Sequence, residues 1–300
     1  MASFWDVQRK NKLYSYALVL AILAIIIVMG YFASELFYGG SWILPVAVVL
    51  SIIYSIGGYF YGDKVVLAVS GAKPADEKEH AYLVNVTEGL ALAAGIPKPK
   101  LYVMQDKSPN AFATGRDPAH ASIAVTTGLL ERMSRAELEG VLAHEMSHVR
   151  NFDTRFMTAV IVLVGLVSIL ANMIGRMAWF GMGRRDERDG RGSGILMAIG
   201  ILLVVFGPIL AQLVRLAISR KREFLADASG AQLTRNPDGL ADALEKLKSA
   251  APMQNANSAT APLFISDPSG GKKQSFFDGV ANLFSTHPPL DERIKMLRAM

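Results

Sequence analysis

The chain alternates between long apolar runs and charged stretches. Four runs of about 20 apolar residues, the length that crosses a membrane as a helix, lie near 14–33, 41–61, 156–175 and 194–218. The cores of the first two carry no charge, and the second ends in an aromatic cluster typical of a membrane interface. This pattern predicts an integral membrane protein.

Charged residues beside the first run predict its orientation. It is preceded by three basic residues, Arg9, Lys10 and Lys12. The loop 33–41 carries only Glu35, and cytoplasmic loops are enriched in Lys and Arg, so residues 62–155 should face the cytoplasm. The first run is too long for a cleavable signal and no small-residue cleavage site follows it, so it should remain as an anchor.

The two later runs leave two alternatives open. The loop between them carries three acidic residues and five arginines, at positions 176, 184, 185, 188 and 191. If both runs cross the membrane, this loop lies outside and opposes the usual distribution of positive charge. Otherwise residues 156–218 form a buried or re-entrant hairpin. In both cases the chain returns to the cytoplasmic side by Arg220.

Composition supports a membrane protein and narrows its chemistry. The 300 residues are 51% hydrophobic and 19% charged, with a mean hydropathy of +0.30, which is too apolar for an ordinary soluble domain. Cysteine is absent, so any metal must be bound by His, Asp or Glu. The net charge of +5 is scattered beside the apolar runs and forms no basic stripe, which argues against a nucleic-acid partner.

Short strands and then a capped helix are predicted between the second and third apolar runs. The segments PKPKLYVMQDKSPNAFATG and ASIAVTTGLLERM have the composition of short strands with turns. Ser134 and Glu137 form a capping box, and apolar residues recur at helical spacing in the AELEGVLAHEMSHV segment that follows. A small sheet beside this helix is therefore expected.

The predicted helix carries the motif HEMSH, from His144 to His148. Residues four apart lie on one helical face, so both imidazoles can bind one tetrahedral ion, and Glu145 can reach water beside it. We expect Glu223 to be the third ligand, because it follows the fourth run on a helical segment and completes a His₂Glu set with an open fourth position. Asp227, four residues later, should accept the ring N–H of a ligating histidine.

A second motif offers a different third ligand. Asn236-Pro237-Asp238-Gly239 resembles the motif of intramembrane site-2 proteases, in which Asp238 would replace Glu223. Those enzymes carry both motifs inside apolar spans, whereas here both lie among charged residues that are costly to bury in hydrocarbon. Asn followed by Pro is also typical of a helix start, so we favour Glu223.

Four separated motifs carry a resemblance that covers nearly the whole chain. LAHEMSHVRNFD, REFLADASGAQL, PNAFATGRDP and STHPPLDERI together resemble the HtpX family of membrane-bound zinc metalloproteases, relatives of the CAAX prenyl endoproteases. The resemblance implies a multi-pass endopeptidase of the cytoplasmic membrane, with its catalytic domain facing the cytoplasm and one Zn²⁺ per chain. Its expected substrates are unfolded or misfolded membrane proteins, in protein quality control.

The expected substrate-binding element comprises Asn110, Ala111 and Phe112. If it forms the edge of the small sheet, an extended peptide could pair with its backbone, which would give broad sequence tolerance. This resembles the family's use of an Asn-Ala-Phe motif. An ordinary turn asparagine is the competing interpretation.

Glu145 is the expected general base, which takes a proton from water and delivers it to the leaving amine. His287 is a candidate donor to the oxyanion, because two prolines would stiffen its loop and the family resemblance puts it by the site. Arg293 would assist in holding the substrate. For His287 and Arg293 the sequence leaves a purely structural role equally open.

The expected fold class is α+β and mostly α, with integral membrane helices and a zincin-like catalytic domain that contains a small β-sheet. Four parts are predicted: a two-span anchor over 1–62, the sheet and metal-binding helix over 63–155, two transmembrane or re-entrant helices over 156–218, and the third-ligand helix, a flexible loop and a C-terminal helix over 219–300. The sequence does not indicate an oligomeric state.

Two other functional classes could use the same metal ligands. A metal transporter or sensor would carry acids and histidines inside its spans, and the first two runs contain none at their cores. An inactive scaffold with structural zinc would fill the fourth coordination position with another His or Cys, for which His287 is the one candidate.

Overall fold

A computed structural model describes residues 43–162, 220–254, 260–268 and 288–300, with eight isolated positions between 9 and 27. The predicted run near 194–218, most of those near 14–33 and 156–175, the arginine-rich loop and His287 lie outside the described residues. Among the helices in the described ranges, none is both long and apolar enough to cross a membrane.

The centre of the fold is a four-stranded mixed sheet with strand order β1-β2-β4-β3. Its strands are β1 (Lys73–Pro74), β2 (Lys100–Met104), β3 (Ala111–Gly115) and β4 (Ala121–Thr126). β2 and β4 are parallel, and the two outer pairs are antiparallel. The predicted small sheet is confirmed, and β3 forms one of its edges.

Alternate residues of the strands bury into two separate apolar cores, as the period of a strand requires. On one face Ala113 and Ile123 pack with the helices that carry the metal-binding motif. On the other face Phe112 and Ala124 pack with the end of α2 (Ile43–Val69) and with Phe264. The sheet is therefore covered on both faces, and the apolar character of its strands follows from this.

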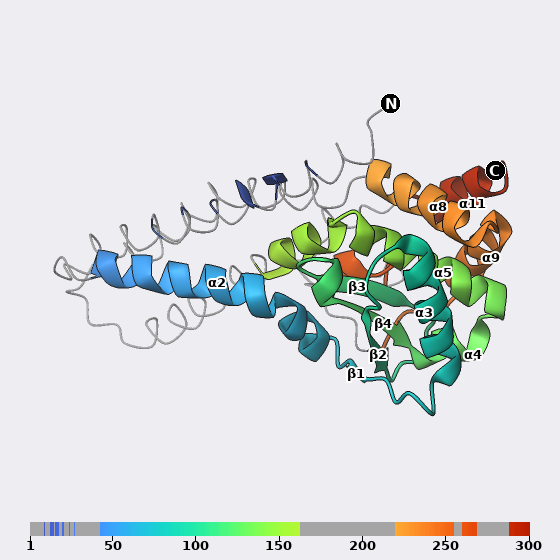
Figure 1. Ribbon diagram of the computed structural model, residues 1–300, viewed down its shortest axis with the longest axis horizontal. Helices are drawn as coiled ribbons and strands as arrows, with labels where there is room; N and C mark the ends of the chain where they lie inside the picture. Colours follow the sequence, from blue (N-terminus) through green and yellow to red (C-terminus); the bar gives the residue numbers. More distant parts are fainter. Residues whose placement is uncertain are drawn as a thin grey trace, which may run out of the picture.

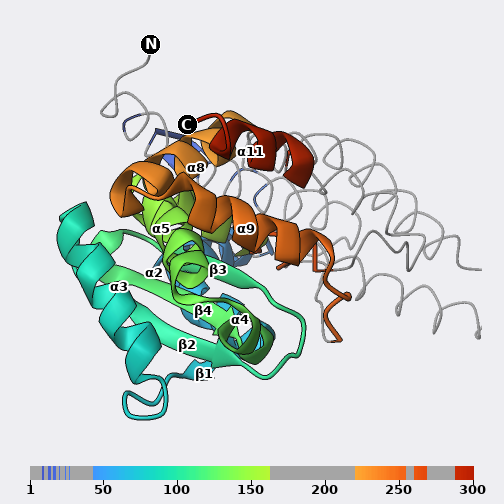
Figure 2. The same cartoon turned by 90° about the vertical axis from the view of Figure 1, so that its right-hand side faces the viewer.

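Helices build the rest of the fold around α5 (Arg135–Arg150). This helix packs between the sheet and the helices α8 (Arg220–Thr234) and α9 (Pro237–Lys248), while α3 (Ala81–Ala94) lies beside it (Figure 2). α11 (Leu290–Leu297) packs on α8 and α9. The shorter helical elements are η1 (Pro118–His120), α4 (Thr127–Arg132) and η2 (Ala261–Leu263).

Both predicted helix starts are confirmed. At α5, Ser134 Oγ accepts a hydrogen bond from Glu137 N at 3.5 Å, and Glu137 Oε2 accepts one from Ser134 N at 2.6 Å. At α9, Asn236 Oδ1 accepts a hydrogen bond from Gly239 N at 3.2 Å, and Pro237 is the first helical residue. These caps satisfy N–H groups that would otherwise lack partners at the helix ends.

Two glycines let α5 approach its neighbours closely. A Cβ added to Gly140 would lie 2.7 Å from the backbone N of Leu240 in α9. A Cβ added to Gly230 in α8 would lie 3.1 Å from the backbone N of His144. The missing side chain at Gly230 brings α8 close to the metal-binding motif, within reach of the acidic side chains that α8 carries.

α2 extends well beyond the sheet, which only its C-terminal part contacts (Figure 1). Large apolar side chains are exposed along its length: Val46, Val49, Ile52, Ile53, Ile56, Phe60, Val65 and Val69. An exposed apolar surface of this extent marks a region that contacts another apolar phase or partner.

Candidate active site

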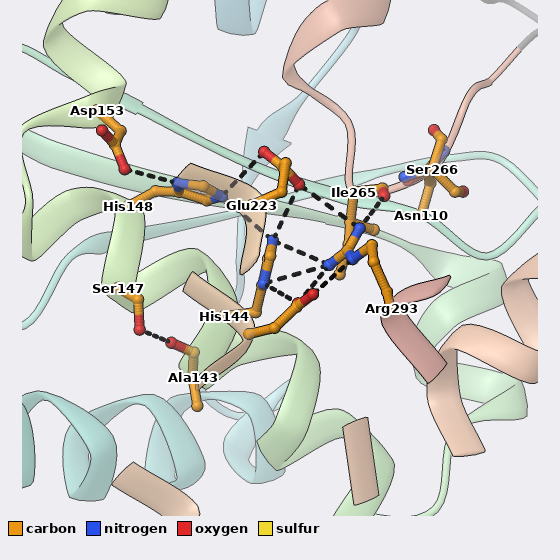
Figure 3. Close-up of polar contacts among 11 residues, drawn as sticks. Asn110, Ala143, His144, Ser147, His148, Asp153, Glu223, Ile265, Ser266 and Arg293 are labelled. Carbon is orange, nitrogen blue, oxygen red and sulfur yellow. Dashed lines mark hydrogen bonds and ion pairs between the residues drawn. The ribbon is translucent and has the colours of Figure 1, made fainter. Parts of the chain in front are cut away.

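His144 and His148 project from one face of α5 toward the same point (Figure 3). Their Nε2 atoms lie 3.2 Å apart. His144 is only 1% exposed, and His148 is partly buried. The helical spacing of four residues brings the two rings together, as the sequence predicts.

Glu223 reaches the same point from α8. Its carboxylate oxygens lie 3.8 Å from His144 Nε2 and 3.6 Å from His148 Nε2, and the three ligand atoms all lie within 4.8 Å of one another. Ligand atoms about 2.0 to 2.1 Å from a tetrahedral zinc ion lie roughly 3.3 Å apart. The donor set and its spacing therefore fit a zinc-sized ion with only small adjustments.

A carboxylate holds the outer nitrogen of each ring. Asp227 lies 2.9 Å from His144 Nδ1, and Asp153 lies 3.0 Å from His148 Nδ1. When Nδ1–H donates to a carboxylate, the lone pair of Nε2 turns toward the metal position, and the ring becomes a stronger ligand. The geometry expected for Asp227 is found, whereas Asp153 was missed by sequence reasoning.

The backbone after α5 explains how Asp153 reaches the site. Phe152 has a φ of 61°, in the left-handed region that non-glycine residues rarely adopt. This residue turns the chain just past the helix end, so that Asp153 comes back against His148, where Arg222 also contacts it at 3.6 Å. The available signal in the sequence is an acidic residue five positions after His148.

Arg293 is fully buried behind His144, which differs from the expectation that it contacts the substrate. Its Nε and Nη2 donate to the two carboxylate oxygens of Asp227 at 2.8 and 2.6 Å. Its Nη1 donates to Ile265 O at 3.2 Å and lies 3.5 Å from Glu223 Oε2. A guanidinium group provides this fork of donors, so Arg293 fixes the acidic groups behind the site.

The two histidines differ in the direction of their pKa shifts. Burial, together with the charge of Arg293, lowers the pKa of His144 to about 4. Burial also acts to lower the pKa of His148, but three carboxylates outweigh it and raise that pKa to about 9: Asp153, Glu223 and Glu145. The negative charge around His148 thus favours a cation beside it.

The charge balance fits a divalent ion. Four carboxylates surround the rings, those of Glu145, Asp153, Glu223 and Asp227. Two guanidinium groups oppose them, those of Arg222 and Arg293. With both rings neutral, as metal ligands must be, the difference of four and two leaves a surplus of two negative charges, which a divalent cation would neutralise.

Glu145 lies beside the histidines in a small cleft. It is 2% exposed, and it lines a cavity of about 30 Å³ together with both histidines and Glu223. This space suffices for a water molecule. Ala113 of β3 and residues 262–265 also line this cleft.

The three residues expected to pair with a substrate have different environments. Asn110 uses its side chain internally: its Nδ2 donates to Ser266 O at 3.0 Å. The carbonyl of Ala111 faces the outer edge of β3 and accepts a hydrogen bond from Ile265 N at 2.9 Å. Phe112 is buried against Phe264, and its backbone N–H and C=O groups point toward β4. These groups are therefore not available to pair with a substrate strand.

The next outward position on the edge is Ala113, which sequence reasoning missed. Thr126 N donates to Asn110 O, so the backbone groups of Asn110 point toward β4. Because this direction alternates along an antiparallel strand, the backbone N–H and C=O groups of the odd-numbered residues from Ala111 to Gly115 point away from β4. Gly115 N donates to Thr158 Oγ1 at 3.4 Å. In the described part of the chain, Ala113 is thus the outward residue of β3 whose backbone groups have no partner.

The alternative ligand Asp238 lies away from this cluster. Its side chain is 66% exposed, and it forms an ion pair with Arg298 at 2.6 Å. In the described ranges, the group that can converge on one ion comprises His144, His148 and Glu223. The site-2 type arrangement is therefore not the one found, and the expected role of His287 falls outside the described residues.

Fold and site together define a metalloprotease. The chain belongs to peptidase family M48, whose sequence model matches residues 77–300. It is 45% identical to a protease HtpX homolog of Caldanaerobacter subterraneus subsp. tengcongensis, over 99% of this chain and 98% of that protein. A protease HtpX homolog of Streptococcus gordonii is 42% identical, over 97% of each chain.

A solved structure has a similar fold. The crystal structure of S. mikatae Ste24p aligns with a TM-score of 0.50 and 18% identity. The alignment covers 97% of this chain but 66% of that longer chain. At this level of identity the likeness concerns the fold alone, a mostly helical α+β architecture with a small mixed sheet.

Proposed function

We propose that the protein is a membrane-bound zinc endopeptidase that cuts unfolded or misfolded membrane proteins on the cytoplasmic side. The observation that carries this proposal is the convergence of His144, His148 and Glu223 on one point, with Glu145 beside it. A Glu next to the ligands suits proton transfer, which a transporter or a structural zinc site does not require.

His144, His148 and Glu223 would hold the zinc ion. When bound, the ion supplies Lewis-acid chemistry, which polarises a peptide carbonyl and acidifies a neighbouring water. Glu145 takes a proton from that water and returns it to the amine that leaves, a contribution on the order of 10² to 10⁴ in rate. Asp227 and Asp153 keep the Nδ1 protons of the two rings in place, so both Nε2 atoms stay available.

The substrate would bind as an extended strand along the edge of β3. The backbone groups of Ala113 face outward, and this residue lines the same cleft as Glu145. Pairing through backbone groups tolerates many side chains, which suits a protease that acts on unfolded proteins. Residues 262–265 already lie along this edge, so a longer substrate strand would displace the hydrogen bond between Ile265 and Ala111.

The membrane location rests on the apolar pattern. Long uncharged runs occur in the sequence, and α2 exposes large aliphatic side chains along its length. Basic residues before the first run favour a cytoplasmic catalytic part. Quality control of membrane proteins follows from this location and from a site that binds backbone rather than particular side chains.

Proteolysis of an unfolded protein by the purified full chain tests the proposal. With zinc present, Glu145→Gln should lose nearly all activity and retain the metal, because Gln cannot accept the proton. Glu223→Ala should lose both activity and bound metal. Asp238→Ala is the matched control, since its exposed carboxylate pairs with Arg298; it should keep both.

The metal content separates the possible failures. Retained cutting by Glu145→Gln would refute the assigned base. Full zinc content in Glu223→Ala would refute the ligand set, and loss of activity in Asp238→Ala with Glu223→Ala still active would favour the site-2 alternative.

A further inference from the structure

Two neighbouring cavities lie where α2 meets the sheet. The larger, of about 310 Å³, has mainly apolar walls from α2 and from residues 155–162, with Ile52, Ile56, Ala159 and Val162 among them. The smaller, of about 220 Å³, is lined by basic groups: Lys64, Lys100, Arg116 and His120. Phe60, Asp63 and Arg116 line both cavities, so the apolar and basic spaces adjoin each other.

The basic cavity has more positive than negative charge. Arg116 contacts Asp117 at 3.5 Å, and Asp63 is the acidic residue in the lining. In the described residues, neither Lys64 nor Lys100 forms an ion pair with a carboxylate. Two ammonium groups without acidic partners therefore face a space that could hold a phosphate group.

Aromatic contacts fix Arg116 at the boundary between the cavities. Its guanidinium carbon lies 4.9 Å from the centre of the Phe60 ring, and its Nη1 donates to Phe60 O at 3.4 Å. Lys64 Nζ lies 4.9 Å from the Tyr61 ring. Aromatic and basic residues combine in this way at the level of lipid headgroups.

The apolar surface of α2 leads to the same point. The exposed side chains of Val49, Ile52, Ile56 and Phe60 recur every three or four residues, so they form one stripe that ends beside Lys64. A long apolar surface that ends at a basic pocket complements an amphiphile with an anionic head. Neither a soluble anion nor a neutral lipid would use both features.

We propose that these cavities bind a phospholipid with an anionic headgroup. Its phosphate would contact Lys64, Lys100 and Arg116, and an acyl chain would enter the apolar cavity. The inference rests on the proposed membrane location but not on the assignment of any catalytic residue. Such a lipid would tie the end of α2 to β2 and to the segment after β3, next to the sheet that carries the substrate edge.

Lipid retention by the full-length, zinc-loaded protein tests this inference. The protein is reconstituted in bilayer discs of phosphatidylcholine with or without phosphatidylglycerol, then extracted, and the bound lipid is measured by mass spectrometry. Phosphatidylglycerol should be enriched over phosphatidylcholine and should raise the melting temperature. The double variant Lys64→Ala/Lys100→Ala should retain roughly 30-fold less phosphatidylglycerol, since each basic group near a lipid surface contributes about 1 kcal/mol and two are removed.

Two further variants distinguish the contributions. Lys78→Ala/Lys107→Ala removes the same charge from exposed positions outside the cavities and should retain phosphatidylglycerol normally. Ala159→Leu narrows the apolar cavity and should weaken retention of phosphatidylglycerol. Equal loss in both lysine double variants would mean unspecific surface charge and would overturn the inference.

Three other outcomes also overturn it. Inorganic phosphate that raises the melting temperature as much as phosphatidylglycerol would mean that the site binds a free anion. Equal retention of neutral and anionic lipid by the wild type would refute headgroup recognition. Retention of neither lipid would also contradict the proposed membrane location, and because proteolysis is not the readout, the proposed catalytic roles are judged separately.

Discussion

Asp153 lies 3.0 Å from Nδ1 of His148, on the side of the ring opposite the metal-binding nitrogen. His144 has the same arrangement with Asp227, at 2.9 Å. The first carboxylate directly follows the turn after α5, and the second comes from α8, more than seventy positions later. Both rings are thereby fixed in the tautomer that leaves Nε2 free to bind a cation.

We predict that Asp153→Asn weakens zinc binding by about 10- to 100-fold, because the amide is a poorer acceptor for the Nδ1 proton and leaves the ring less basic. Competition with a chelator measures this affinity. Asp267→Asn provides a change of the same kind outside the site and should leave the affinity unchanged. An unaltered affinity in Asp153→Asn would show that the helix alone orients His148.

The buried pair of Asp227 and Arg293 leads to a second prediction. Asp227→Ala leaves a guanidinium group buried without its carboxylate, which should destabilise the protein by about 3 to 5 kcal/mol. In the double variant Asp227→Ala/Arg293→Met the charge is gone, so the melting temperature should partly recover. Zinc affinity should stay low, because His144 still lacks its acceptor.

The same double variant can contradict this account. If zinc affinity recovers together with the melting temperature, Asp227 acts only by neutralising Arg293, and its contact with His144 is not important for metal binding.

Ala113 tests how the substrate binds. Ala113→Pro removes an N–H group that faces outward from the edge strand, where proline is tolerated. We expect a higher KM for an unfolded protein substrate with unchanged zinc content and only a small change in melting temperature. Ala113→Ser keeps the N–H and should resemble the wild type. Equal KM values in both variants would mean that substrates do not pair with this edge.

Sequence reasoning succeeded where a local rule applied. The capping box at Ser134, the spacing of His144 and His148, and the start of α9 each depend on residues within one or two helical turns. Glu223 was reached because a zinc site without cysteine needs a carboxylate or histidine as its third ligand, and Glu223 stands four residues before Asp227 on a helical segment after the fourth apolar run.

Three features of the site could not be predicted from a local sequence rule. Asp153 depends on a left-handed residue, Phe152, which no residue preference predicts. The burial of Arg293 depends on how α11 packs on α8, and the availability of Ala113 rather than Phe112 depends on which residues face β4. The first depends on the conformation of one residue, and the other two depend on contacts between separate elements. A single sequence contains no periodic signal for any of them.

Gly140 allows a prediction about the packing of α5 on α9. A methyl group at this position would lie 2.7 Å from a backbone atom of Leu240, so Gly140→Ala should push the helices apart and cost about 1 to 3 kcal/mol. Gly89→Ala, in α3, adds a methyl with no atom within 4 Å and should stabilise the helix by up to about 1 kcal/mol. If Gly140→Ala and Gly89→Ala shift the melting temperature in the same direction, the close approach of α5 to α9 at Gly140 is contradicted.

Glu137 connects the start of α5 to α9 and should make stability depend on pH. Burial acts to raise the pKa of Glu137, but hydrogen bonds from Lys246 and Ser134, with the charge of Lys246, outweigh it and lower this pKa below its ordinary value of 4.5. Since the folded pKa is the lower one, the ionised carboxylate stabilises the fold above about 4.5. This contribution is lost as the pH falls through the folded pKa.

The variant Glu137→Gln isolates that charge, because the amide oxygen can still accept the hydrogen bond from Ser134 N. At neutral pH it should be less stable than the wild type by about 1 kcal/mol, and the difference should vanish in acid. Glu139→Gln, whose partner Arg135 is exposed, should change the melting temperature little at any pH. A difference between Glu137→Gln and the wild type that persists in acid would mean that packing, and not charge, connects α5 to α9 at this position.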